Sequence, residues 1–133
     1  MISPETRNRV RHRANYRCEY CQLSEHHSPL AHHVEHIVAK QHQGSDDPSN
    51  LALACHRCNL KKGPNLAGID PETGQLVPLF DPRKQPWLDH FRMSGASIQG
   101  TTPAGRATVR LLALNDERRL DLRRTILSRG EYL

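Results

Sequence analysis

The chain has 133 residues, of which 36% are hydrophobic and 5% aromatic, so we expect one small domain over residues 1–133. Lysine and arginine outnumber aspartate and glutamate by 19 to 14, which favours an acidic partner such as nucleic acid. No apolar run reaches the roughly 18 residues of a membrane span. The opening residues lack the apolar centre of a signal peptide. We therefore expect a soluble, cytoplasmic protein.

The first predicted element is a helix from Pro4 to Ala14, because Ser3 suits the N-cap and a proline suits the first helical position. Its arginines have little apolar company, so this is a surface helix whose charged face either meets phosphates or is simply solvated. These arginines are Arg7, Arg9, Arg11 and Arg13.

The middle of the chain predicts a strand, a loop, a second strand and a helix. Residues 31–38 (AHHVEHIV) favour a strand, whereas residues 40–50 are rich in turn formers and predict a loop. Residues 51–54 are long enough only for a strand. A short helix then begins at Cys55 and is ended by Gly63.

Beyond residue 64 the patterns are weaker. Residues 75–79 favour a strand, residues 91–99 a hairpin, and residues 104–114 a helix with apolar residues at helical spacing. A last helix is expected over residues 116–128, with Asn115 as its cap. The candidates for its inner face are Leu120, Leu122, Ile126 and Leu127.

Two cysteine pairs, each of the form C-x-x-C, have 33 residues between them. Two such pairs complete a tetrahedral all-thiolate zinc site with no open position, so the zinc is expected to be structural. Free thiols or a redox pair are the alternatives, and a reducing compartment disfavours disulfides. The predicted ligands are Cys18, Cys21, Cys55 and Cys58. His56 lies inside the second pair and is superfluous as a fifth ligand.

Polar residues around the cysteine pairs occur in a characteristic order: C18-EY-C21, V34-E-H-I-V38, G44-S-D-D-P-S-N-L51 and A54-C-H-R-C-N-L-K-K-G63. This order resembles HNH endonucleases of the ββα-metal type, in the branch whose hairpin and helix are braced by a four-cysteine zinc. The resemblance covers about residues 15–64. It implies an α+β protein with a ββα-metal core, an N-terminal helix and a mixed or helical extension over residues 65–133.

The resemblance implies hydrolysis of phosphodiester bonds in DNA. His36 is the expected general base, because a neutral imidazole suits that role near pH 7. Glu35 and Asn59 are the expected ligands of one divalent ion, Mg²⁺ or Mn²⁺, since hard cations prefer oxygen donors. Asn50 is expected to tie down the connecting loop and so to aim the His36 ring.

Two departures from the family pattern and one geometric difficulty bear on this site. Gly63 stands where some HNH members place a further histidine, and Glu35 stands where Asp or His is more usual. Adjacent residues of a regular strand point to opposite faces, so Glu35 and His36 serve one site only if the strand ends, bends or bulges there. His33 is the nearest rival base and is expected to pack or hydrogen-bond behind the site.

Basic residues near the second half of the motif are candidates for phosphate contacts, which would give sequence-independent and salt-sensitive affinity. They are Lys40, Arg57, Lys61 and Lys62. For each of them a solvated side chain is an equally good interpretation. Asp46 and Asp47 are interpreted as loop acids.

Other functions fit parts of the pattern. A four-cysteine zinc module that binds DNA or RNA without catalysis explains the charge and the cysteines, and a protein-interaction module of the zinc-ribbon kind explains the cysteines alone. Taken singly, Glu35 and His36 favour a solvated strand face, and it is their joint occurrence with Asn59 that favours an enzyme. One such site makes one cut, so a double-strand break requires a homodimer or two visits.

Overall fold

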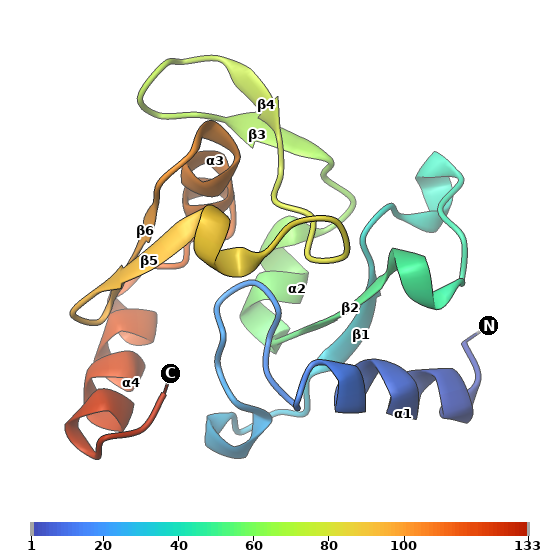
Figure 1. Ribbon diagram of the computed structural model, residues 1–133, viewed down its shortest axis with the longest axis horizontal. Coiled ribbons are helices and arrows are strands. Elements are labelled where there is room, and N and C mark those ends of the chain that lie inside the picture. The colour runs from blue at the N-terminus through green and yellow to red at the C-terminus, as the bar shows by residue number, and fades with distance from the viewer. Residues whose placement is uncertain (1, 133) are drawn as a thin grey trace.

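The computed structural model describes residues 2–132 and arranges them in four α-helices and three two-stranded antiparallel sheets (Figure 1). The N-terminal helix α1 (Pro4–Arg13) is capped by Ser3, whose hydroxyl oxygen accepts a hydrogen bond from the Thr6 backbone N–H. The predicted helix and its cap are therefore confirmed. Within the described chain, no helix has the length and apolar character needed to cross a membrane.

The hairpin and helix of the middle segment also follow the sequence prediction. Strand β1 (His33–His36) pairs antiparallel with strand β2 (Leu51–Ala54), and the pairing stays regular along both strands. Helix α2 (His56–Lys62) begins directly after Cys55, whose side chain caps it, and ends at Gly63. Gly63 has a positive φ of 49°, a conformation that glycine adopts at little cost. Strand β1 is shorter than the predicted 31–38.

The predicted loop between β1 and β2 consists of two 3-10 turns, Lys40–His42 and Pro48–Asn50, joined by a tight return. Gly44 permits this return, because a Cβ at that position would lie only 1.7 Å from the carbonyl oxygen of Val38. The loop therefore folds back against the end of β1 and brings Asp46 close to that strand.

Strand β2 is central to the N-terminal half, since all four of its residues are buried. Leu51 and Leu53 pack with Val10 of α1 in one apolar cluster. Ala52 and Ala54 belong to a second, larger cluster that contains the cysteines. This alternation is what successive strand residues produce, so β2 separates α1 from the cysteine cluster.

The extension beyond residue 65 has a further two hairpins and two helices. They are β3 (Ala67–Ile69), β4 (Leu76–Pro78), β5 (Phe91–Ser94), β6 (Ser97–Gly100), α3 (Pro103–Leu111) and α4 (Glu117–Ser128). The expected strand at 75–79, the hairpin at 91–99 and both helices are present, whereas β3 was not predicted. The short β3 is too brief to leave a periodic pattern in the sequence.

One buried cluster includes residues of both halves. Aromatic side chains of the extension form its centre, with ring centroids 5.1 Å apart for Phe80 and Phe91 and 5.0 Å apart for Trp87 and Phe91. Tyr20, near the first cysteine pair, stands edge-on to Phe80 with ring centroids 6.4 Å apart. The indole N–H of Trp87 donates to the carbonyl oxygen of Tyr20 at 2.8 Å. Apolar packing thus joins the extension to the cysteine-bearing segment.

The inner face of α4 differs from the prediction. Its buried residues are Arg119, Arg123 and Ile126, while Leu122 is 37% exposed. The cap is Asp116, whose carboxylate accepts the Arg119 backbone N–H, and not Asn115. Apolar spacing failed here because both buried guanidinium groups find main-chain carbonyl partners, which sequence periodicity does not reveal.

Candidate active site and metal centre

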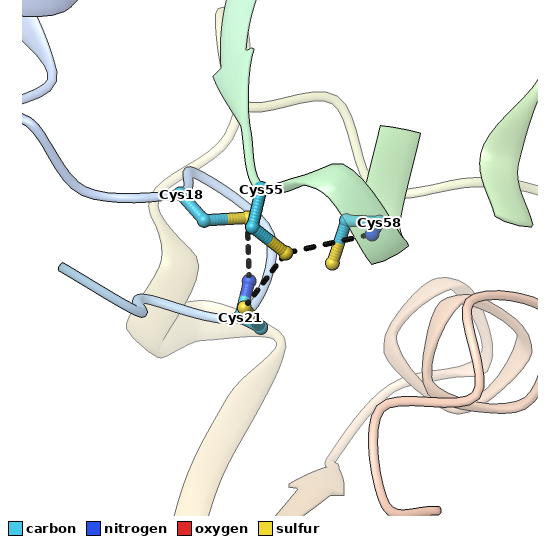
Figure 2. A group of neighbouring side chains, drawn as sticks. All are labelled: Cys18, Cys21, Cys55 and Cys58. Carbon is cyan, nitrogen blue, oxygen red and sulfur yellow. Dashed lines mark hydrogen bonds between the residues drawn. The ribbon is translucent and has the colours of Figure 1, made fainter. Parts of the chain in front are cut away.

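The four cysteines converge on one point, as Figure 2 shows: Cys55 and Cys58 come from the start of α2, and Cys18 and Cys21 from a loop of the N-terminal half. All four sulfur atoms lie within 4.8 Å of one another, and all four side chains are buried. The sulfur atoms of Cys21 and Cys55 are 3.7 Å apart. A tetrahedron with zinc–sulfur bonds of about 2.3 Å has an edge of about 3.8 Å, so the cluster suits a structural zinc.

Backbone N–H groups also point at the sulfurs. The N–H of Cys21 donates to Cys18 Sγ and that of Cys58 to Cys55 Sγ, both at 3.4 Å. Such contacts stabilise thiolates, the form in which cysteine binds metal. The chemistry and the spacing of this donor set therefore fit zinc and leave no open position for a reactant.

A residue of the extension completes this centre, and sequence reasoning missed it. The guanidinium of Arg119 on α4 donates to Cys58 Sγ at 2.9 Å and lies 3.8 Å from Cys55 Sγ. Burial by itself lowers the pKa of Arg119, but the neighbouring thiolates outweigh it and raise that pKa. A four-thiolate zinc site carries net negative charge, and the Arg119 guanidinium supplies a neutralising cation in contact with it.

Glu35 points into the interior from β1. Its carboxylate accepts a hydrogen bond from the Tyr20 hydroxyl and lies 3.3 Å from the ammonium of Lys62. Burial raises the pKa of Glu35, while Lys62 and Tyr20 act in the opposite direction. The carboxylate is thus satisfied by two partners from different elements. Its predicted role as a metal ligand stays a prediction.

Lys62 does not lie where the sequence analysis placed it. Its side chain is 2% exposed, and its ammonium donates to the carbonyl oxygen of Ile37 at 2.9 Å as well as pairing with Glu35. The predicted contact with a DNA phosphate is therefore wrong for the structure as it stands. The reason is that Lys62 lies on the face of α2 turned toward β1, where a buried carboxylate and carbonyl oxygens attract it.

His36, the expected general base, is the last residue of β1. Its Nε2 lies 2.7 Å from Oδ1 of Asp46, which also accepts a hydrogen bond from Lys40 at 3.2 Å. The hydrogen bonds from His36, first, and from Lys40 hold the pKa of Asp46 well below its usual range. Asp46 is thus a partner of the histidine rather than merely a loop acid. An acid ten residues after the histidine, in a turn-rich loop, is the only sequence signal that could have indicated it.

Asn50 ties down the loop that carries Asp46. Its side-chain amide accepts the Val38 N–H at 2.9 Å and donates to the carbonyl oxygens of Val38 at 3.0 Å and Ser45 at 2.9 Å. These are the contacts expected of a residue that shapes the loop. Whether Asn50 in this way aims the His36 ring for catalysis stays a prediction.

Glu35 and His36 project to different sides of β1, as neighbours on a regular strand do. Glu35 faces Tyr20 and Lys62, whereas His36 faces Asp46 in the loop. The Lys62 ammonium also lies 3.4 Å from the main-chain carbonyl oxygen of His36, which connects Glu35 with the backbone of His36 but not with its imidazole. The imidazole of His36 and the carboxylate of Glu35 therefore have different partners, and their service in one site stays a prediction.

The remaining predicted residues lie on β1 and α2 in different environments. Asn59 is half-buried on α2, one turn before Lys62, so it shares the helix face that contacts β1. His33 is exposed, with its Nε2 3.2 Å from Nδ1 of His56. Lys61 is exposed. Arg57 pairs with Asp116 of the extension at 2.9 Å, so its charge is already partly matched.

Residues 18–65 match the model of a protein family described as HNH endonuclease. This segment of the chain is an HNH endonuclease domain, and it contains the buried four-cysteine cluster. The family is one of nucleases, so the match of this segment implies nuclease function and nucleic-acid binding. Searches of curated proteins and of solved structures found no match to the chain.

Proposed function

We propose that this protein is a metal-dependent endonuclease that hydrolyses phosphodiester bonds in DNA. The HNH match of residues 18–65, the net charge of +5 and the histidine–carboxylate pair at the end of β1 support this function. We also propose a cytoplasmic location, because the four cysteines that would bind zinc must stay reduced.

The observation that carries the proposal is the pairing of His36 with Asp46. Nε2 lies 2.7 Å from the ionised carboxylate, so the neutral ring carries its proton on Nε2 and donates a hydrogen bond from it to Asp46. Nδ1 is then the unprotonated nitrogen, and we assign it to accept a proton from the attacking water. The carboxylate holds the ring in this tautomer and stabilises the imidazolium that forms.

Glu35 and Asn59 are the proposed ligands of one divalent ion. Their oxygen atoms suit Mg²⁺ or Mn²⁺, and Asn59 lies on the same helix face as Lys62, which already contacts Glu35. The fit has one condition, namely that the Lys62 ammonium leaves the carboxylate. A bound divalent ion would offset the negative charge that develops on the phosphoryl group and the leaving oxygen.

Positioning and binding are assigned to neighbouring residues. Asn50 keeps the loop in the conformation that presents Asp46 to His36. Lys61 is exposed and is proposed to contact the DNA backbone, with Lys40 and Arg57 contributing in addition to their carboxylate contacts. A site of this kind cuts one strand, so a double-strand break would require a homodimer or a second binding event.

A zinc module that binds DNA or RNA without cleaving it is the second candidate. The ion pair between Lys62 and Glu35 favours it, because this pair satisfies the carboxylate without a metal ion. Zinc-dependent DNA binding with no cleavage in Mg²⁺ or Mn²⁺ would support this candidate. Absence of DNA affinity even at low salt would instead favour a protein-interaction module.

Nicking of supercoiled plasmid in the presence of Mg²⁺ or Mn²⁺ tests the proposal. We expect H36A to lose at least about 100-fold in rate, the usual contribution of a general base. D46N is expected to lose about tenfold, since the ring keeps its place but loses its charged partner. H42A, which removes an exposed histidine from the same loop, is the matched control. Equal nicking by wild type and H36A would reject the assignment of the base.

A further inference from the structure

The ammonium group of Lys62 lies buried in the interior of the HNH segment. The ammonium of Lys62 lies 3.3 Å from Oε2 of Glu35, 2.9 Å from the carbonyl oxygen of Ile37 and 3.4 Å from that of His36. The side chains of Lys62 and Glu35 are 2% and 5% exposed. A lysine buried to this extent is uncommon, and its three oxygen contacts account for its presence.

The oxygen atoms around this ammonium resemble those that a hard metal ion selects. One carboxylate and two carbonyl oxygens surround a single positive charge, and Asn59 offers an amide oxygen one helical turn away. The Tyr20 hydroxyl binds the other carboxylate oxygen and leaves Oε2 to the cation. Lysine and a divalent ion would therefore use the same oxygen of Glu35.

We propose that Lys62 occupies the carboxylate of Glu35 as an internal counter-ion and that a divalent ion binds there only by displacing it. This inference rests on the proposed function, because it concerns the same ion. Two cations on one buried carboxylate repel one another, so the ammonium lowers the affinity of the chain for metal. In the absence of metal, Lys62 keeps Glu35 charged and buried without an unpaired charge.

The structure also provides space for the displaced side chain. Lys62 lines a cavity of about 290 Å³ between the end of β1 and the segment that follows β4. Asp81 and Lys84 line the same cavity. The ammonium can therefore move away from Glu35 toward an opening that contains a carboxylate, without unfolding α2.

Mn²⁺ binding to the zinc-loaded full chain, followed by electron paramagnetic resonance, tests this inference without any cleavage assay. K62Q is expected to bind Mn²⁺ about tenfold or more tightly than wild type, in the range by which groups around a site change metal affinity. K84Q removes a positive charge from the same cavity and is the matched control, expected to bind like wild type. The double variant E35Q/K62Q should lose the tight binding. Equal or weaker binding by folded K62Q would overturn the inference.

A measurement on the wild-type chain applies if K62Q does not fold. The ¹⁵N signal of the Lys62 ammonium should shift as Mg²⁺ is added, and it should not shift in E35Q. Mg²⁺ that saturates the chain while this signal stays unchanged would contradict displacement. The outcome is separable from that of the proposed function. Tight Mn²⁺ binding by K62Q, with no plasmid nicking by the wild-type chain, would support the role of Lys62 and reject the nuclease. Plasmid nicking by the wild-type chain, with no tighter Mn²⁺ binding by K62Q, would support the nuclease and reject the role of Lys62.

Discussion

The HNH segment (residues 18–65) and the extension (residues 66–132) are organised by different interactions. In the HNH segment, four cysteines and a polar network around Glu35 and His36 determine how a short hairpin meets a short helix. In the extension, aromatic packing and buried guanidinium groups hold the hairpins and helices together. Arg123, for example, donates to the carbonyl oxygens of Ala96 and Leu114. A segment built around metal ligands leaves its pattern in the sequence, whereas one built around main-chain carbonyls does not.

The two regions meet at the cysteine cluster. Arg119 contacts Cys58, the Tyr132 hydroxyl donates to the carbonyl oxygen of Cys21, and Arg57 of α2 pairs with Asp116 at the start of α4. The extension thus contributes side chains that contact the cysteine-bearing segments at several points. The comparison predicts that disturbing the cluster affects both regions, while disturbing the extension far from the cluster leaves the HNH segment intact.

Removing the zinc should have the largest effect. C58S takes away one ligand and also the sulfur that accepts from Arg119, so we expect both regions to lose their fixed packing. Circular dichroism melting together with the zinc content of the purified chain measures this. A variant that retains one equivalent of zinc and melts like wild type would show that the cluster is not what unites the two regions.

Removing the arginine that contacts the cluster should destabilise the protein strongly, although less than loss of the zinc. R119Q leaves the sulfurs of Cys58 and Cys55 without their cation and is expected to lower the free energy of unfolding by about 3 kcal/mol, as for other broken buried charge pairs. It should also speed the release of zinc to a chromogenic chelator. R118Q changes the exposed neighbour and is the control. Equal denaturation midpoints for the two variants would show that the charge of Arg119 does not stabilise the cluster.

The sequence predicted those parts of the fold whose causes are local. Ser3 caps α1, Cys55 begins α2 and Gly63 ends it, and the signal for each lies within a few residues. The cysteine cluster was equally predictable, because a metal requires several ligands of one type at set spacings. The family order of the polar residues then identified the segment without any knowledge of its contacts.

The parts that could not be predicted depend on partners distant in sequence. Lys62 faces inward because Glu35, 27 residues earlier, lies on the opposing strand. Arg119 is buried because Cys58, 61 residues earlier, offers a sulfur. Both side chains are charged, so a prediction from hydropathy places them on the surface. In the candidate site, the sequence indicated His36 and Asn50 as candidates, but the contact of Asp46 with His36 became visible only in the folded loop.

A change far from the cluster should give the smallest effect and should be confined to the extension. Asp70 at the end of β3 is fully buried and accepts two hydrogen bonds from Arg106 of α3, which hold the pKa of Asp70 well below its usual range. The folded pKa is lower than the unfolded one, so this carboxylate stabilises the fold above about pH 4 and the contribution is lost as the pH falls through the folded pKa.

D70N should therefore melt below wild type at pH 7, and the difference in melting temperature should narrow as the pH is lowered beneath 4. E72Q, at an exposed neighbour that also contacts Arg106, serves as control. Because neither variant touches the cysteines, zinc content and Mn²⁺ binding should match wild type, and loss of zinc in D70N would mean that the two regions are coupled more tightly than their contacts indicate.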